Sequence, residues 1–418
     1  MDFLIELDDG RTLTYNTDPC ALTWEDGTPV DLKRFAYNYV DAPSQSDQIA
    51  FGKDTPVVSK ASPRVLKIQL GLGCNYSCSY CSQGGQKEEA TSSKDAEEFD
   101  FKWVSGCPEK VELWGGEPLL YWKKIEALVP KIHAEFGKIR ISIVTNGTLL
   151  TKERVDWLYD KGFTMAISHD GPGQHLRGED PLQDPEKLAV WCYAFEKFGE
   201  RISINSVLTA YNHDLFDLWM WFEERLGTVK LNVEDIVTDY GGAKMSDEDL
   251  MKVYESVKKH ASSGLALVFP RVRFAVQQFM ETLAIKKPLF GASQVCQMDR
   301  KDYVAVDLKG NVLTCQNAGA QDHTIGNIAD LGAVKLDTAT SYMNRPNCKS
   351  CPVVHLCYGS CMFLEGKDFD SSCRASYWYN RALIEGAIKL LTGSEVFTIS
   401  GWKPQSAMRV IPIKVATC

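Results

Sequence analysis

The chain has 418 residues, 44% of them hydrophobic, and a formal net charge of −9. That length and apolar content predict a globular protein of two or more domains. The acidic balance disfavours nucleic acid and anionic membranes as partners, the acidic N-terminus does not fit a secretory signal, and no apolar run is long enough for a membrane span, so we expect a cytoplasmic protein.

Residues 1–60 alternate apolar and polar residues around two Asp-Gly pairs, which predicts small hairpins. From Val65 the pattern changes to short apolar runs alternating with segments of helical periodicity, which is typical of repeated βα units and a parallel sheet. The expected strands are 65–71, 110–114, 139–144, 163–168, 202–208 and 229–234, and the expected helices between them are 120–136, 151–160, 184–198 and 213–226. Six such units are too few for a closed eight-stranded barrel, so the α/β pattern predicts a partial (β/α)6 TIM-like barrel.

The C-terminal part of the chain has a different character. Two more helices are expected at 245–262 and 272–286, and seven cysteines then occur among short strands between Cys296 and Cys373. A helix is expected at 374–393. We therefore divide the chain into an N-terminal β-rich accessory segment (1–63), the partial barrel (64–240), bridging helices (241–295), a separate cysteine-rich domain (296–373), and a C-terminal helix and tail (374–418).

Three cysteines, Cys74, Cys78 and Cys81, directly follow the first strand of the expected barrel. In a chain without a secretory signal, fourteen cysteines predict metal ligands or catalytic thiols before disulfides. The Cys-x3-Cys-x2-Cys spacing fits three corners of a cubane 4Fe-4S cluster better than a zinc site, which would need a second pair of ligands at matching distance. The fourth iron would then be open to a small molecule.

This motif, with Tyr80 immediately before the third cysteine, resembles the radical S-adenosylmethionine (SAM) superfamily. Four more motifs stand at the ends of later strands, in the order Gly115-Gly116-Glu117-Pro118, Thr145-Asn146-Gly147, Ser168-His169-Asp170-Gly171-Pro172 and Asn205-Ser206-Val207-Leu208. Alone, each is most often an ordinary turn, but ligands of parallel sheets bind at these strand ends. The resemblance implies reductive cleavage of SAM to a 5′-deoxyadenosyl radical that abstracts a hydrogen atom.

The strand-end motifs also supply the expected SAM contacts. The resemblance implies that the paired glycines and Glu117 hold the amino end of SAM. Short hydroxyl, amide and carboxylate groups suit its ribose and carboxylate, and an arginine fork suits the carboxylate. The expected cofactor-binding residues are Tyr80, Gly115, Gly116, Glu117, Asn146, Ser168, Asp170, Arg177 and Asn205.

The seven later cysteines resemble the SPASM extension of radical SAM enzymes, which implies two auxiliary 4Fe-4S clusters. By that resemblance the nearer cluster takes Cys296, Cys315 and Cys361, and the farther one takes Cys348, Cys351, Cys357 and Cys373. Some members have a further cysteine where this chain has Asp302, so the nearer cluster has either an open iron or an oxygen ligand such as Asp302. A zinc site is the alternative, and most of the spacings fit it poorly.

The resemblance determines the cofactors better than the substrate. SPASM enzymes commonly modify peptides, and the expected reaction is an oxidative carbon–carbon or carbon–sulfur crosslink in a ribosomally made precursor peptide, with flavodoxin or ferredoxin as electron donor. Sulfatase-maturing members have an aspartate base directly after the second SPASM cysteine, whereas this chain has Gln316-Asn317, and amides are not bases near neutral pH. The candidate bases are then His323 and Asp322.

Other reactions stay open at this level. They are formylglycine formation in a sulfatase, oxidation of a small alcohol, and epimerisation of a peptide. A noncatalytic iron–sulfur scaffold or electron carrier is the alternative of another class. An edge strand within residues 1–60 could also bind an extended precursor peptide by β-addition.

Overall fold

The computed structural model describes residues 1–32, 61–236, 245–264, 268–287, 289, 294–335, 342 and 345–404. Much of the predicted accessory segment, at 33–60, and the end of the predicted tail, at 405–418, lie outside the described residues. Among the described helices, none combines the length and apolar content that a membrane span requires.

A nine-stranded sheet with the order β12-β11-β10-β4-β5-β6-β7-β8-β9 forms the centre of the molecule. Its parallel strands follow one another in chain order: β4 (Val65–Gln69), β5 (Lys110–Trp114), β6 (Arg140–Thr145), β7 (Phe163–Ser168), β8 (Ile202–Leu208) and β9 (Leu231–Ile236). The six predicted βα strands are therefore confirmed.

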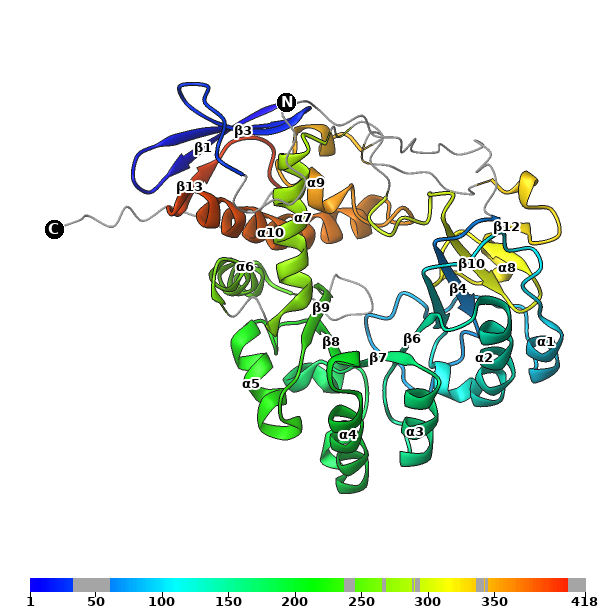
Figure 1. The fold of residues 1–418 in the computed structure, drawn as a ribbon. Helices are drawn as coiled ribbons and strands as arrows, with labels where there is room; N and C mark the ends of the chain where they lie inside the picture. The colour runs from blue at the N-terminus through cyan, green and yellow to red at the C-terminus, as the bar shows by residue number, and fades with distance from the viewer. Residues whose placement is uncertain are drawn as a thin grey trace.

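Helices cover the convex face of this curved sheet (Figure 1). They are α1 (Ser93–Glu98), α2 (Trp122–Phe136), α3 (Lys152–Asp160), α4 (Pro185–Phe198) and α5 (Leu215–Leu226). Strand residues alternate between the two faces, so the buried side chains of Leu66, Ile68, Val111 and Leu113 belong to one face. The other face carries half-buried polar side chains such as Lys67. A polar concave face suits a polar ligand better than a second layer of core.

The cysteine-rich region continues the large sheet. β10 (Tyr303–Asp307) pairs in parallel with β4, and β11 (Asn311–Leu313) and β12 (Thr324–Asn327) extend the sheet in antiparallel pairing. The prediction of a separate unit at 296–373 is therefore wrong for these strands. The physical reason is that Val304 and Val306 of β10 are fully buried and cover an edge of β4 that would otherwise be exposed.

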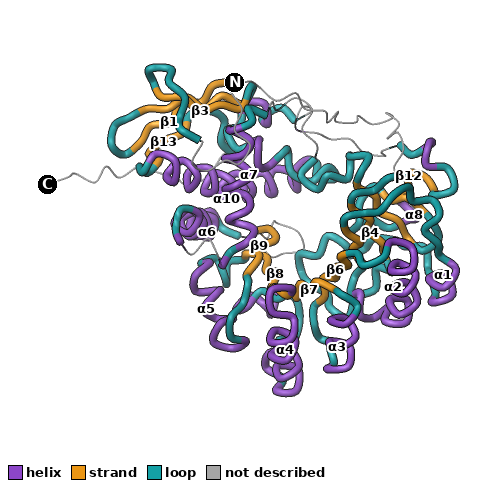
Figure 2. Tube along the Cα trace, viewed as in Figure 1, coloured by secondary structure: helices purple, strands orange, loops and turns teal. Residues whose placement is uncertain are grey.

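A second, four-stranded sheet has the order β13-β1-β2-β3. It contains the predicted N-terminal hairpins, β1 (Asp2–Leu7), β2 (Thr12–Thr17) and β3 (Cys20–Trp24), and β13 (Val396–Ile399), which pairs with β1. The predicted C-terminal tail thus contains a strand. In Figure 2 this small sheet lies beyond the long helix, away from the large sheet.

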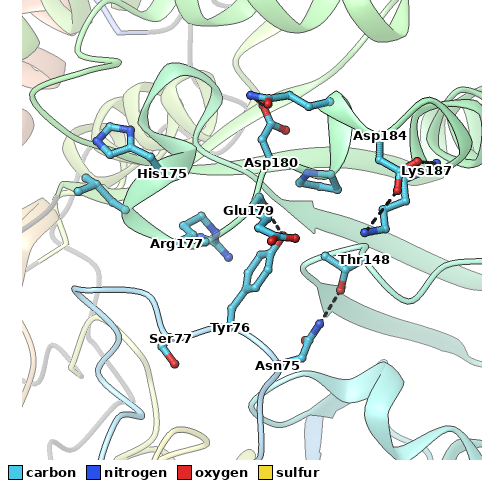
Figure 3. A pocket seen from close by; sticks show the side chains of 14 residues that line it. Asn75, Tyr76, Ser77, Thr148, His175, Arg177, Glu179, Asp180, Asp184 and Lys187 are labelled. Carbon is cyan, nitrogen blue, oxygen red and sulfur yellow. Dashed lines mark hydrogen bonds and ion pairs between the residues drawn. The ribbon is translucent and has the colours of Figure 1, made fainter.

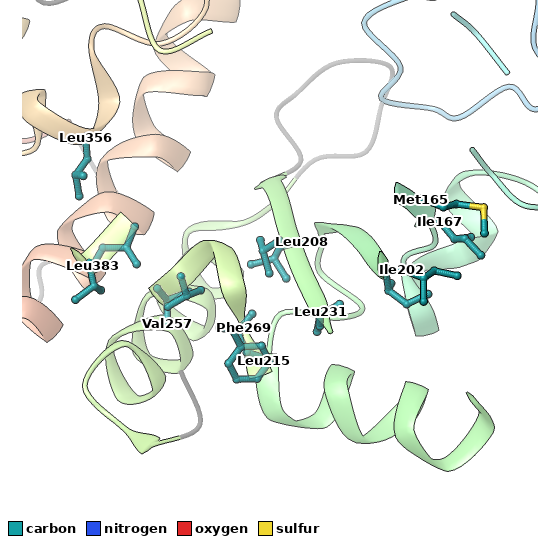
Figure 4. Close-up of a cluster of buried hydrophobic side chains, with 14 of the residues drawn as sticks. Met165, Ile167, Ile202, Leu208, Leu215, Leu231, Val257, Phe269, Leu356 and Leu383 are labelled. Atoms are coloured by element: carbon teal, nitrogen blue, oxygen red, sulfur yellow. The ribbon is translucent and has the colours of Figure 1, made fainter. Parts of the chain in front are cut away.

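Helices connect the two sheets. α6 (Asp247–Ala261) and α7 (Pro270–Ala284) confirm the two predicted bridging helices, and both pack against α10 (Gly366–Thr392). α10 begins eight residues before the predicted start at 374, so Cys373 lies within it. Two short helices, α8 (Ala320–His323) and α9 (Val354–Cys357), complete the cysteine-rich region. Buried apolar side chains run from Ile167 and Leu208 of the large sheet through Val257 of α6 to Leu383 of α10 (Figure 4).

Candidate cofactor site

Cys74, Cys78 and Cys81 lie in the loop that follows β4. The backbone N–H of Cys81 donates to the carbonyl of Cys78 at 3.1 Å, and that of Tyr76 donates to Cys74 Sγ at 3.4 Å. The three thiols interact electrostatically with one another, and burial raises the pKa of Cys78 to about 11. Three thiols gathered in one loop fit the donor set of a cluster with three protein ligands.

A cubane cluster places different demands on its ligands from a mononuclear site. Within the described residues, no three His, Cys, Asp or Glu side chains are arranged to hold a metal ion. In a cubane each thiolate binds a different iron, so the sulfur atoms need not converge on one point. The loop therefore fits an iron–sulfur cluster better than zinc.

Gly115 and Gly116 pack directly against the backbone of residues 71–73, at the start of the cysteine loop. The N–H groups of Gly116 and Glu117 donate to carbonyls of this segment at 2.9 Å each. A Cβ atom would lie 2.4 Å from a carbonyl oxygen at Gly115 and 2.3 Å from one at Gly116. No side chain larger than hydrogen fits there, so the glycine pair sets the path of the loop that carries Cys74.

Glu117 is 1% exposed and links the ends of β5 and β6. Its carboxylate accepts hydrogen bonds from Thr145 Oγ1 at 2.6 Å, from the N–H of Asn146 at 2.7 Å and from the N–H of Leu119 at 2.9 Å. Burial raises its pKa, although these donors oppose the shift. A carboxylate has about four acceptor positions, so three bonds leave one for a further donor such as an ammonium group.

Asn146 connects the third strand end to the cysteine loop. Its Nδ2 donates to Asn75 Oδ1 at 2.8 Å, and its Oδ1 accepts from Thr148 N at 3.0 Å. Asn75 Nδ2 in turn donates to Thr148 Oγ1 at 2.8 Å, which is drawn in Figure 3. The Asn146 amide thus fixes Asn75, the neighbour of Cys74. Both polar atoms of the Asn146 side chain, which we expected to contact SAM, are used in these hydrogen bonds.

Tyr80, Asp170 and Arg177 form one buried network between the cysteine loop and the end of β7. Asp170 is fully buried and accepts hydrogen bonds from the Tyr80 hydroxyl and, at 2.9 Å, from the N–H of Val207. Arg177 Nη1 donates to the Tyr80 hydroxyl at 3.0 Å and lies 3.7 Å from the Asp170 carboxylate. Burial opposes the Arg177 charge, but Asp170 and Tyr80 outweigh it and raise the Arg177 pKa.

One buried donor of Arg177 has no partner among the described residues. Its Nε is buried and makes no hydrogen bond to any other residue that the structure describes. An unpartnered buried donor is costly, and a bound anion such as a carboxylate would satisfy it.

Ser168 and Asn205 face each other in the register of β7 and β8. The Ser168 hydroxyl is half-buried and makes no hydrogen bond within the described part of the chain, whereas Asn205 Oδ1 accepts from Asn232 Nδ2 at 3.1 Å. Ser168 is therefore the better placed of the two for a ligand contact.

His169, between two of the predicted contacts, has a structural role. It is fully buried, its Nδ1 accepts from the N–H of Gly171 at 2.9 Å, and its Nε2 lies 2.9 Å from Asp180 Oδ1. Nε2 must then carry the proton that it donates to Asp180. Burial lowers the His169 pKa, so the ring stays neutral and fixes the turn that carries Asp170.

A cavity of about 810 Å³ opens beside the cysteine loop (Figure 3). Its walls are residues 75–77 of that loop, Thr148, the segment 175–184 and Lys187. Arg177 is its one contributor among the expected SAM contacts, so the cavity adjoins the network described above and does not contain all the expected contacts. This cavity could not be predicted from the sequence, because its walls come from three different strand ends.

Comparison with known proteins agrees with this geometry. A model of the radical SAM superfamily matches residues 68–212, which include the three cysteines and all four strand-end motifs. Residues 68–212 therefore form a radical SAM domain. The chain is a radical SAM enzyme through this domain, and SAM and one 4Fe-4S cluster are the cofactors that this family implies.

Two curated relatives and one solved structure are similar to this radical SAM enzyme. Radical SAM cyclopropyl synthase TigE from Paramaledivibacter caminithermalis is 22% identical over 72% of this chain and 68% of its own length. The serine-type anaerobic sulfatase-maturating enzyme of Klebsiella aerogenes is 21% identical, over 71% and 79%. The structure of native anSMEcpe with bound AdoMet and Cp18Cys peptide has a TM-score of 0.52 at 20% identity, covering 79% of this chain and 98% of that one. The predicted partial-barrel fold is confirmed.

Four cysteines of this radical SAM enzyme line one small cavity beside α9 and α10. They are the four that the sequence assigns to the farther auxiliary cluster, Cys348, Cys351, Cys357 and Cys373. Phe369, Tyr377 and Trp402 are among the other residues of its walls. Burial raises the pKa of Cys373 to about 12 and also that of Cys351. Four thiols around an apolar-walled cavity match the donor set of a 4Fe-4S cluster.

The other three cysteines of the SPASM pattern, Cys296, Cys315 and Cys361, also lie together. Their thiols interact electrostatically, and burial raises the pKa of Cys296 to about 12. The suggested oxygen ligand, Asp302, does not join them. Its carboxylate pairs instead with Arg300 Nε at 2.7 Å and Arg64 Nε at 3.1 Å, because it lies just before β10, beside β4.

The two candidate bases, Asp322 and His323, do not lie at the cavity beside the cysteine loop. Asp322 is exposed, and the ring of His323 packs against Phe363 with 4.8 Å between centroids. Neither is among the residues that line the cavity beside the cysteine loop.

Gln316 and Asn317, which replace the aspartate of sulfatase-maturing enzymes, contact the concave face of the sheet. Asn317 Oδ1 accepts from Trp114 Nε1 at 2.8 Å, and the Gln316 amide bonds to Lys67. Lys67 Nζ also lies 3.1 Å from the Glu112 carboxylate. Sequence reasoning missed this ion pair, although charged residues at alternate positions of an apolar strand were a signal for it.

Proposed function

We propose that this enzyme is a SPASM-type peptide maturase that forms an oxidative crosslink in a ribosomally made precursor peptide. The observation that carries the proposal is the grouping of the seven later cysteines into a set of four around one cavity and a set of three. These sets are the proposed ligands of two auxiliary 4Fe-4S clusters, and Cys74, Cys78 and Cys81 are those of the SAM-binding cluster.

The residues of the cofactor site then have distinct tasks. When bound and reduced, the first cluster supplies the electron that cleaves SAM into methionine and a 5′-deoxyadenosyl radical. Glu117 and the glycine pair fix the cysteine loop, and the open acceptor position of Glu117 binds the SAM ammonium group. Arg177, held by Asp170 and Tyr80, binds the SAM carboxylate through its free Nε, and Ser168 donates to the ribose. Gly115, Gly116, Asn146 and Asn205 act by positioning these groups.

The electron balance explains the auxiliary clusters. Forming a crosslink removes two hydrogens from the peptide: one leaves as an atom to the adenosyl radical, and the other leaves as a proton and an electron. The seven later cysteines would hold clusters that can accept that electron, and flavodoxin or ferredoxin would supply the electron that starts the reaction. The proton that leaves the peptide is accepted by a group near Gln316 on the concave face of the sheet, where the Glu112 carboxylate lies.

A peptide substrate agrees with the relatives. TigE is named as a cyclopropyl synthase, and anSMEcpe has been solved with a bound peptide. Sulfatase maturation is the second candidate, because of the likeness to the Klebsiella enzyme. Gln316-Asn317 disfavours it, since neither amide can remove the proton of a serine or cysteine.

The test begins with anaerobic reconstitution, iron analysis and incubation with reductant and SAM. We expect about twelve iron atoms per chain, for three clusters, and formation of 5′-deoxyadenosine. Replacing the three loop cysteines by alanine should abolish 5′-deoxyadenosine, whereas Cys107→Ala, at an exposed cysteine outside the sites, should not. If the wild-type enzyme forms no 5′-deoxyadenosine, the chain is an iron–sulfur scaffold or electron carrier.

The substrate is tested by coexpression with short peptides encoded beside this gene. A crosslink gives a product lighter by two hydrogens. An unchanged mass with deuterium uptake from heavy water would instead indicate epimerisation, and conversion of a sulfatase cysteine or serine to formylglycine would establish the second candidate.

A further inference from the structure

Arg345 is a buried arginine that none of the roles above uses. The residue is 5% exposed, and its Nε makes no hydrogen bond to any other described residue. Among the described residues, no Asp or Glu side chain pairs with its guanidinium group. Because a buried charge without a counter-charge is strongly unfavourable, the site needs a negative partner that the described carboxylates do not provide.

The guanidinium group lies between the two sets of later cysteines. Its Nη2 donates to the carbonyl of Cys361 at 2.9 Å and to that of Leu364 at 3.0 Å. Its Cζ stands 3.7 Å from the centre of the Phe369 ring, and Phe369 lines the cavity of the four-cysteine set. One side of Arg345 therefore contacts a ligand of the three-cysteine set and the other contacts the wall of the four-cysteine set.

The strongest electrostatic partners of the Arg345 charge among the described residues are predicted cluster ligands. They are the thiols of Cys348, Cys357 and Cys373, from the four-cysteine set, and of Cys361, from the three-cysteine set. An arginine that is screened by carboxylates would have other partners, as Arg381 has in Glu385 at 2.7 Å.

We propose that Arg345 is the counter-charge shared by the two auxiliary clusters and that it raises the reduction potential of both. This inference rests on the auxiliary clusters of the proposed function. Each reduction adds one electron to a group that is already anionic, and a cation fixed in a low-dielectric interior stabilises the reduced form more than the oxidised form. Arg345 thereby makes both clusters better acceptors for the electron that leaves the peptide.

The test compares Arg345→Gln and Arg345→Lys with the wild-type holoenzyme by potentiometric titration followed by EPR. In Arg345→Gln we expect the equilibrium constant for reducing the auxiliary clusters to fall at least tenfold, which is about 59 mV for one electron. Arg345→Lys keeps the charge and should restore most of the potential.

Arg374→Gln is the matched control. Arg374 lies in α10, next to the predicted cluster ligand Cys373, but it pairs with Asp247 and donates to the Met245 carbonyl at 3.1 Å. Its loss should leave the potentials unchanged. The potential of the SAM-binding cluster should not move in any variant.

The outcomes separate this inference from the proposed function. Unchanged auxiliary potentials in Arg345→Gln, or loss of iron from Arg345→Gln and Arg345→Lys alike, would overturn the counter-charge role. Loss of iron from Arg345→Gln alone would support it, because only the charge distinguishes the two variants in that case. A wild-type enzyme with about four iron atoms and one cluster signal would instead overturn the auxiliary clusters of the proposed function.

Discussion

The carboxylate of Asp302 is either an ion-pair partner or a cluster ligand, and replacing it distinguishes the two roles. Loss of an ion pair lowers stability, whereas loss of a ligand removes iron. It is 20% exposed and pairs with Arg64 and Arg300. We expect Asp302→Asn to leave the iron content and the EPR spectrum unchanged and to lower the free energy of unfolding by about 1 kcal/mol, the usual value for a partly exposed pair. Iron analysis and urea denaturation measure the two effects. A missing cluster signal would restore Asp302 as a ligand.

The Asp170 carboxylate stabilises the positive charge of Arg177, so replacing Asp170 by a neutral residue should weaken SAM binding. Asp170→Asn leaves a buried guanidinium without its carboxylate, and breaking such a pair costs about 3–5 kcal/mol. We expect SAM affinity to fall by more than tenfold, measured by equilibrium binding to the reconstituted enzyme. Tyr80→Phe is the matched comparison. It keeps the ion pair and removes one hydroxyl, so its effect should be about 1 kcal/mol. Equal effects of the two variants would contradict this assignment.

At the residue scale the sequence was most informative where spacing along the chain carries the chemistry. The cysteines and the strand-end motifs were found because metal ligands and strand ends recur at fixed intervals. The partners of these residues were not found, because Glu117 meets Thr145 only through the order of neighbouring strands. Arg345 carried no signal at all, since a lone arginine before a cysteine pair is unremarkable until the fold buries it.

The turn after β7 is an element whose stability should depend on pH through His169. Because burial lowers its pKa in the folded protein, the unfolded chain takes up a proton first as the pH falls. Stability from this residue is therefore complete above about 6.5, the ordinary histidine pKa, and is lost as the pH falls toward the lower folded value. We expect His169→Asn to be less stable than the wild-type enzyme and to lose less stability between pH 7.5 and 5.5. Thermal denaturation across that range measures it.

His175→Asn provides the control for the pH effect. His175 is exposed, so its replacement should leave the pH profile of the wild-type enzyme unchanged. Identical profiles for wild type and His169→Asn would contradict the role of the buried ring.

The junction between β5 and the cysteine loop leaves no room for a side chain. Gly116→Ala would bring Cβ to 2.3 Å from a backbone oxygen of the 71–73 segment, and backbone cannot yield as a side chain can. We expect a loss of about 1–3 kcal/mol in stability and a cysteine loop displaced from its cluster. Gly264→Ala, where no described atom lies within 4 Å of the new Cβ, should change neither. Iron retention and 5′-deoxyadenosine formation measure the outcome, and a fully active Gly116→Ala would show that the loop tolerates the shift.

Among the elements, those with strong local signals were predicted well. β5, β7 and β8 have the predicted ends, because their apolar runs stop at turn residues. α10 began earlier than predicted because its first turns include polar residues and Cys373 and are stabilised by packing on α6 rather than by an apolar stripe. β13 has four residues and exists because β1 offers it an edge, which no local pattern reveals.

For the whole molecule, the main surprise is that the cysteine-rich region and the partial barrel share one sheet. The sequence favoured separate domains because the composition changes sharply after the bridging helices. Sheet pairing is not visible in composition: β10 comes more than two hundred residues after β4 and still aligns with it residue by residue, with Val306 opposite Ile68. Cys315, which follows β11, is consequently fixed through β10 to the first strand of the radical SAM barrel.

A shared sheet predicts that damage to β10 unfolds the radical SAM domain as well. Val306 is fully buried, and an unpaired charge there should cost several kcal/mol. We expect Val306→Asp to lose iron from all three clusters and to stop cleaving SAM, with a single unfolding transition at lower temperature. Lys301→Asp, at an exposed position just before β10, should behave as the wild-type enzyme. If Val306→Asp lost only the auxiliary clusters and still produced 5′-deoxyadenosine, β4 would be stable without its neighbour. The two regions would then fold independently. The edge of the parallel sheet beside buried Leu66 and Ile68 would in that case tolerate exposure to water.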